Sequence, residues 1–126
     1  MIREVINDQM ESLGIPFQYG EEYEDLGDGI PDCYYVGRCS PSPLASESPM
    51  QSGQLVLSGW SKTIEAYDDL VGFQERLKAF FFSPVRFKTD KGAAVLEWSH
   101  ENVIPSDVEN VHRREAYLNY YEWSVI

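Results

Sequence analysis

Cysteine, histidine and basic residues are all scarce in this chain of 126 residues. It has two cysteines, two histidines, and ten Lys and Arg against twenty-one Asp and Glu, so its net charge is −11 at pH 7. Tight binding to nucleic-acid phosphates or to an anionic membrane requires clustered cations, which argues against both partners. The acidic balance is compatible with a protein past which DNA moves without adhering, although solubility is the commoner reason for such a composition.

Long apolar runs are also missing. No stretch approaches the roughly twenty apolar residues of a membrane span. The first residues include Arg3 and Glu4, with no apolar stretch behind them, so they do not resemble a secretory signal. We therefore expect synthesis and folding in the cytoplasm, where thiols stay reduced. In one extended strand Cys33 and Cys39 would lie about 20 Å apart, too far for a disulfide.

The sequence lacks the motifs of common enzymes and metal sites. His100 and His112 are isolated, and neither His-Glu-x-x-His nor Cys-x-x-Cys spacing occurs. There is no Gly-x-Ser-x-Gly elbow and no phosphate-binding glycine loop. The acidic, turn-rich residues 21–32 lack the alternate carboxylates and the closing Glu of a calcium loop. We expect no catalytic residues, no metal site and no cofactor.

Two amphipathic helices are predicted, at residues 2–13 and 64–82. Gly14 and Pro16 end the first. The second has Thr63 as its N-cap, negative charge in its first turns, and Pro84 beyond its end. Its apolar residues recur at spacings of three and four and are interrupted only at Gln74. The members of this stripe are Tyr67, Leu70, Val71, Leu77, Phe80 and Phe81.

Alternating apolar and polar residues predict several strands. A loop with three prolines and five serines, residues 40–53, separates two of them and is expected to be flexible, either a tolerated insertion or a binding arm. Residues 99–114 are predicted to be a connector that has room for one extended or helical turn, and the basic spot 112–114 is interpreted as a salt-bridge or edge-strand feature rather than an anion site. An extended segment begins at residues 17–19. The predicted strands are residues 33–39, 54–60, 85–89, 94–98 and 115–126, and the pair 85–89 and 94–98 forms a hairpin.

These elements predict a single α+β domain over residues 1–126, in which a mostly antiparallel sheet packs against two helices. The last strand has two apolar faces, with Tyr117 and Tyr121 on one and Leu118 and Tyr120 on the other. Both faces are therefore expected to be covered, by the helices and either an opposing layer or a neighbouring subunit. The high aromatic content, 13%, suits subunit contacts as well as a core.

The order helix, strand, strand, long loop, strand, helix, hairpin, final strand resembles the tail-terminator and tail-completion proteins of long-tailed bacteriophages. The resemblance is carried by the helix at residues 1–6, by residues 30–36 entering a strand after a turn, and by residues 55–60 leading into the second helix. It implies a structural virion protein, assembled in the host cytoplasm, whose subunits form a ring, usually of six. The implied partners are further copies of the chain, the tail-tube protein and the head–tail connector protein.

On this interpretation the protein is not an enzyme, and exiting DNA would pass an acidic bore without tight binding. A head-completion or connector protein, another minor tail protein, an acidic DNA mimic and a small hydrolase are the alternatives. Concentration of the acids in residues 21–32 weakens the DNA-mimic alternative. The candidate subunit contacts are Trp60, Tyr117, Tyr121, Trp123, Leu44 and Met50.

Overall fold

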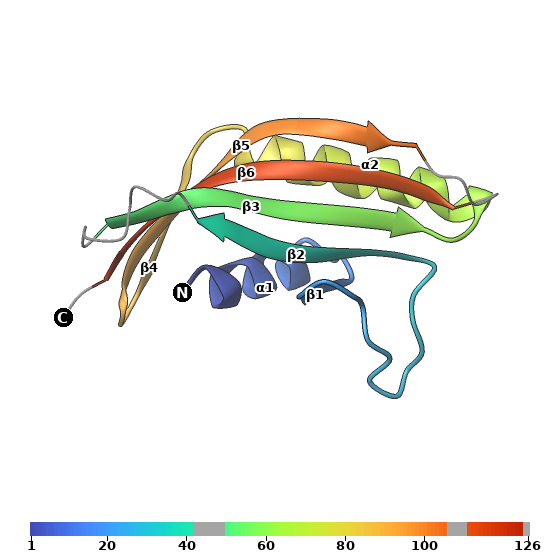
Figure 1. Cartoon of the computed structure of the whole chain (residues 1–126), viewed down its shortest axis with the longest axis horizontal. Coiled ribbons are helices and arrows are strands. Elements are labelled where there is room, and N and C mark those ends of the chain that lie inside the picture. Colours follow the sequence, from blue (N-terminus) through green and yellow to red (C-terminus); the bar gives the residue numbers. More distant parts are fainter. Residues whose placement is uncertain (42–49, 106–110, 125–126) are drawn as a thin grey trace.

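Two helices and six strands make up residues 1–41, 50–105 and 111–124, the part of the chain that the computed structural model describes (Figure 1). The predicted α+β class is confirmed, and both helices end within one residue of the predicted bounds. In chain order the elements are α1 (Ile2–Ser12), β1 (Phe17–Tyr19), β2 (Cys33–Pro41), β3 (Met50–Ser61), α2 (Ile64–Phe81), β4 (Val85–Thr89), β5 (Gly92–Ile104) and β6 (His112–Ser124).

The strands form one curled, mixed sheet in the order β1-β2-β3-β6-β5-β4. Only the pair β1–β2 is parallel, so the sheet is mostly antiparallel as predicted. β6, the last element in sequence, inserts between β3 and β5 in the middle of the sheet. Short β1 and β4 are left as the two edges.

Local sequence explains where the helices begin and end. The Thr63 hydroxyl accepts a hydrogen bond of 3.0 Å from the Ala66 N–H, which caps α2 as predicted. After α1 the chain turns at Gly14, whose φ of +72° favours glycine. Neither described helix is long and apolar enough to cross a membrane.

Both helices contribute to one core on the same side of the sheet (Figure 1). The sheet supplies leucines with no exposed surface, and α2 packs closely on β3 at Gly59, where an added Cβ would lie 2.6 Å from Leu70 Cδ1. The fully buried leucines of the sheet are Leu55, Leu57, Leu96 and Leu118.

Two predictions about segments between strands are corrected by the structure. Residues 99–104 and 112–114, which were predicted to be part of a connector, are strand, because β5 continues to Ile104 and β6 begins at His112. The predicted loop 40–53 is also too long, since residues 40–41 belong to β2 and residues 50–53 to β3, where Ser40 pairs with Gln54. The rest of that loop, residues 42–49, lies outside the described residues.

The apolar stripe of α2 also differs in part from the prediction. Phe80 is 37% exposed, whereas Ala66, which the prediction omitted, is buried. Gln74, the predicted interruption, is buried with 2% of its surface exposed, so it is a polar member of the core. The buried residues of α2 are Ala66, Leu70, Gln74, Leu77 and Phe81.

Candidate functional site

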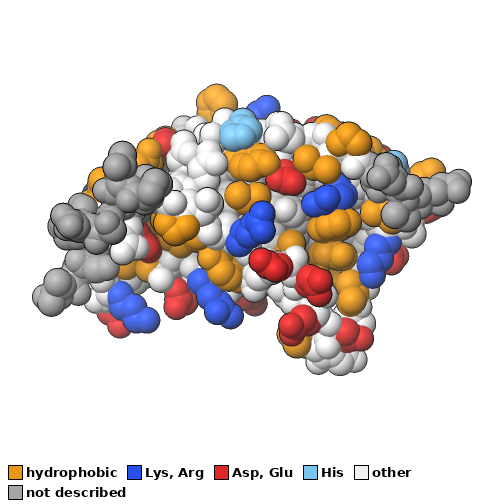
Figure 2. All heavy atoms as spheres, viewed as in Figure 1, with side chains coloured by type: hydrophobic (Ala, Val, Ile, Leu, Met, Phe, Trp, Pro, Cys, Tyr) orange, Lys and Arg blue, Asp and Glu red, His pale blue; other side chains and the backbone are white. Residues whose placement is uncertain are grey.

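The sheet face opposite the helices, which we call the open face, carries the aromatic residues singled out from the sequence. Along β3 and β6, side chains that alternate with the buried leucines point to this face. Over these strands Figure 2 shows hydrophobic side chains interspersed with charged ones. Five of the six candidate contacts lie here: Trp60, Tyr117, Tyr121, Trp123 and Met50. The sixth, Leu44, lies outside the described residues.

The candidates on the open face differ in exposure. Trp123 is 38% exposed and Met50 36%, and the two residues are paired in the β3–β6 register. Trp60, Tyr117 and Tyr121 are half-buried. The apolar surface is therefore most accessible at the end of the face nearest β4, where large aromatic groups favour burial against another protein.

A continuous set of contacts crosses the open face from β3 to β6. The Arg113 guanidinium lies 3.9 Å from the centre of the Trp60 ring, and its Nη2 lies 3.9 Å from Glu115 Oε1. The Tyr117 hydroxyl donates a hydrogen bond to the Glu115 carboxylate. That bond, assisted by burial, raises the pKa of Tyr117, so the phenol stays protonated. These contacts order the aromatic rings without a partner.

A β-bulge brings His100 to the same face. Trp98 pairs with Leu118 and His100 pairs with Tyr117, which leaves Ser99 as an extra residue in β5. The His100 ring is stacked on Tyr117, with 4.2 Å between centroids and 6° between planes. Without the bulge, strand alternation would place His100 on the helix side.

A small polar hollow of about 150 Å³ lies beside Trp60. Arg38, Arg113 and Glu115 line it from the sheet, and Glu21 from the segment that follows β1. Small-molecule sites usually enclose about 300–1,000 Å³, so this hollow suits water or one side chain of a partner better than a substrate.

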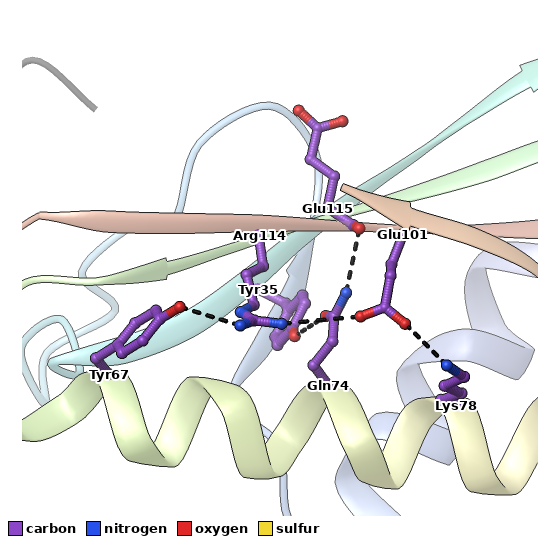
Figure 3. A network of polar contacts seen from close by, with 7 residues as sticks. All are labelled: Tyr35, Tyr67, Gln74, Lys78, Glu101, Arg114 and Glu115. Carbon is purple, nitrogen blue, oxygen red and sulfur yellow. Dashed lines mark hydrogen bonds and ion pairs between the residues drawn. The ribbon is translucent and has the colours of Figure 1, made fainter. Parts of the chain in front are cut away.

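The other side of the sheet contains a polar network that ties α2 to β6 (Figure 3). The Tyr35 hydroxyl donates to the Gln74 side-chain oxygen, and Gln74 Nε2 donates to the Glu115 carbonyl at 3.1 Å. Burial raises the pKa of Tyr35, which keeps the hydroxyl neutral and able to donate. Figure 3 shows the Glu115 side chain pointing away from this network, so one residue takes part in contacts on both faces.

A second branch of the network contains the ion pairs of Glu101. Arg114 Nη2 donates to the Tyr67 hydroxyl at 3.0 Å, and Arg114 Nη1 lies 3.8 Å from Glu101 Oε1. Lys78 Nζ lies 3.3 Å from the other oxygen of Glu101 (Figure 3). Together the two branches fix the position of α2 on the sheet.

The side chains of Arg113 and Arg114, in the basic spot 112–114, therefore lie on opposite faces of the sheet. Its interpretation as a salt-bridge feature is confirmed, because Arg113 pairs with Glu115 and Arg114 with Glu101. Its interpretation as an edge-strand feature is wrong, since β6 lies between β3 and β5. The sequence analysis did not identify Glu115 and His100 as members of the contacts on the open face. For Glu115 the available signal was that residues 113, 115 and 117 alternate onto one side of the strand.

In the described chain, the side chains that could bind a metal ion do not lie close together. Cys33 and Cys39 are free thiols in β2, as their spacing predicts. Within residues 1–41, 50–105 and 111–124, no three His, Cys, Asp or Glu side chains are grouped as ligands for a metal ion.

No protein-family model matches the chain, and no curated protein matches its sequence.

Proposed function

We propose that this chain is a structural subunit of a bacteriophage tail, a tail terminator whose copies form a ring that caps the tail tube and joins it to the head connector. The main support for the proposal is the set of side chains on the open face. Five aromatic or apolar side chains chosen from the sequence as subunit contacts lie together there, on the side of the sheet away from both helices.

The physical argument is that this face has the composition of a protein interface. Interfaces are enriched in Trp, Tyr, Met and Arg, and the open face supplies each of these types. Trp60 and Tyr117 are already ordered by Arg113, His100 and Glu115, so little side-chain entropy would be lost on binding. The apolar second face of β6 is then buried by assembly.

Two further features support an assembly role. In the described chain the helices and strands follow each other in the order on which the phage resemblance rests. The net charge of −11 would repel phosphate, so DNA leaving the head would pass a ring of these subunits without adhering.

The direct test is deletion of the gene from its phage, with electron microscopy of the resulting particles. We expect tails of uncontrolled length, or heads and tails that remain unjoined, and mass spectrometry should find the chain in purified wild-type particles. Particles that assemble normally without the chain would contradict the proposal. So would gene neighbours that encode neither a tail-tube protein nor a head connector.

Variants test whether the open face carries the role. Trp123→Ser and Tyr121→Ser should prevent complementation of the deletion while leaving the unfolding transition of the isolated protein nearly unchanged, because neither side chain belongs to the core. Phe82→Ser is the matched control: it removes an aromatic side chain that is 72% exposed at the end of α2, away from the open face. It should complement normally.

A further inference from the structure

The two edges of the sheet carry opposite charge. Beyond edge strand β1 the chain continues into the acidic residues 21–32, which project from the molecule below β1 and β2 (Figures 1 and 2). At the other edge, β4 presents Arg86 and Lys88 to solvent. In the sheet order these two strands stand at opposite ends.

An acidic hollow of about 610 Å³ lies between α1, β1 and the projecting segment. Glu21, Glu22 and Glu24 line it together with Leu26, which is 81% exposed. Among the described residues that line it, Arg3 is the one cation; its guanidinium carbon lies 5.5 Å from the centre of the Tyr19 ring in β1. The hollow therefore combines excess negative charge with an exposed leucine.

This acidic surface is held in place by hydrogen bonds. The Gln18 side chain bonds to both the N–H and the carbonyl of Glu24, each at 2.7 Å. The Asp25 carboxylate accepts bonds from the N–H groups of Gly27 and Gly29 at 2.8 and 2.9 Å. Because the backbone around Leu26 is organised in the single chain, docking would require little ordering.

The β4 edge borders a second hollow, of about 530 Å³ and mainly apolar. Val95, Ala93 and Trp123 line it on the open face, and Arg86 and Lys88 stand at its side. Within the described residues neither cation forms an ion pair. An apolar surface flanked by unpaired cations matches a partner that presents an apolar side chain among carboxylates.

We infer that these two surfaces bind each other between copies of the chain: the acidic hollow of one copy receives the β4 edge of the next, with Leu26 against Val95 and Trp123 and with Glu22 and Glu24 facing Arg86 and Lys88. This inference rests on the proposed function, since it names the contact through which the ring would close. The occupant is a second copy because the same chain supplies both complementary surfaces.

The placement of the surfaces determines the kind of assembly. Two different patches at opposite edges make a head-to-tail contact, which closes into a ring or continues as a filament and is not limited to a dimer. Each copy has a net charge of −11, so most arrangements of two copies are repelled. The contact that places the acidic hollow against the β4 edge replaces this repulsion with local attraction.

Charge reversal tests the inference on the full chain, with analytical ultracentrifugation and native mass spectrometry at high micromolar concentration. Arg86→Glu/Lys88→Glu should weaken self-association by about tenfold or more, and so should Glu22→Lys/Glu24→Lys. All four side chains are exposed, so circular dichroism and thermal unfolding should be unchanged. An equimolar mixture of the two double variants should regain wild-type association, because each edge again meets a surface of opposite charge.

The control is Asp68→Lys/Glu75→Lys, which reverses two exposed carboxylates on α2 and changes the net charge as much as the hollow variant does. It should leave association unchanged. A wild-type chain that stays monomeric, unaltered association in either edge variant, or a mixture that fails to associate would each overturn the inference.

The particle experiments separate this inference from the proposed function. If particles contain the chain and require it, but the mixture of charge-reversed variants does not associate, the tail role stands and the docking contact is wrong. If the mixture associates but normal particles form without the chain, the contact stands and the tail role is wrong.

Discussion

Replacing Gln74 by leucine tests whether the buried polar network holds α2 on the sheet. Gln74 is 2% exposed and Tyr35 is fully buried, so the variant leaves the Tyr35 hydroxyl without its acceptor in a place that water does not reach. An unsatisfied buried hydroxyl costs about 1–3 kcal/mol, and the lost bond to the Glu115 carbonyl adds about 0.5–1.5 kcal/mol. Burial of the leucine side chain returns about 1–2 kcal/mol.

The expected net effect of Gln74→Leu is a loss of about 1–3 kcal/mol in the free energy of unfolding, measured by equilibrium urea denaturation with an unchanged m-value. Tyr35→Phe should cost about 1–3 kcal/mol because it leaves the Gln74 oxygen unpaired. The double variant removes both partners, so its loss should fall short of the sum of the single losses by about 1–2 kcal/mol.

Gln51→Leu is the control, because it makes the same substitution at an exposed position of β3 and should change stability by less than about 0.5 kcal/mol. A Gln74→Leu protein as stable as the wild type would refute the reasoning. So would losses that add within about 0.5 kcal/mol in the double variant, since the two residues would then not act together.

Three further predictions concern particular residues. Gly59→Ala should lower the free energy of unfolding by about 1–3 kcal/mol, because the new Cβ would lie 2.6 Å from Leu70 Cδ1; Gly72→Ala, whose new Cβ would have no described atom beyond its own helix backbone and chain neighbours within 4 Å, should raise it by about 0.5–1 kcal/mol. Burial raises the pKa of Cys33 to about 12, so in the native protein at pH 8 this thiol should react with iodoacetamide at least about a hundredfold more slowly than in the unfolded chain; equal rates would place it at the surface. Two backbone hydrogen bonds lower the pKa of Asp25, so the order it gives its loop is present above the ordinary Asp pKa and is lost as the pH falls through the lowered value; NMR titration should show this midpoint, and an ordinary one would contradict the bonds.

Much of the fold follows from local patterns in the sequence. The spacing of apolar residues predicts both helices to within one residue, and the cap at Thr63 is present as expected. Alternation predicts the centres of the strands. These signals suffice because each depends on residues close together in the chain.

The errors arise where polar side chains are satisfied by distant partners. Residues 99–114 contain charges that interrupt alternation, yet Glu101 is paired with Lys78 from α2 and Arg114 from β6. Ends of β2 and β3 were missed for a similar reason: Ser40, Pro41 and Gly53 do not predict a strand by themselves, but Ser40 pairs with Gln54 and Pro41 with Gly53 across the ladder. No local pattern contains these long-range contacts.

The sequence predicted which kinds of residue would form the candidate contacts, but it did not predict which of them lie together in space. Alternation within β6 separates Tyr117, Tyr121 and Trp123 from the leucine face, but it does not show that Trp60 and Met50 join them. That requires the β3–β6 register, which brings together residues more than fifty positions apart. Gln74 was visible as an interruption of the α2 stripe, although its partners Tyr35 and Glu115 were not.

The extra residue in β5, Ser99, changes the effect that deletion of one residue is expected to have on a strand. Because Ser99 has no counterpart in β6, shortening the chain by this residue would convert an irregular ladder into a regular one. His100 would still meet Tyr117, and Glu101 would still face Lys78. A one-residue deletion, which in most strands exchanges the inner and outer side chains, would here leave both sets where they are.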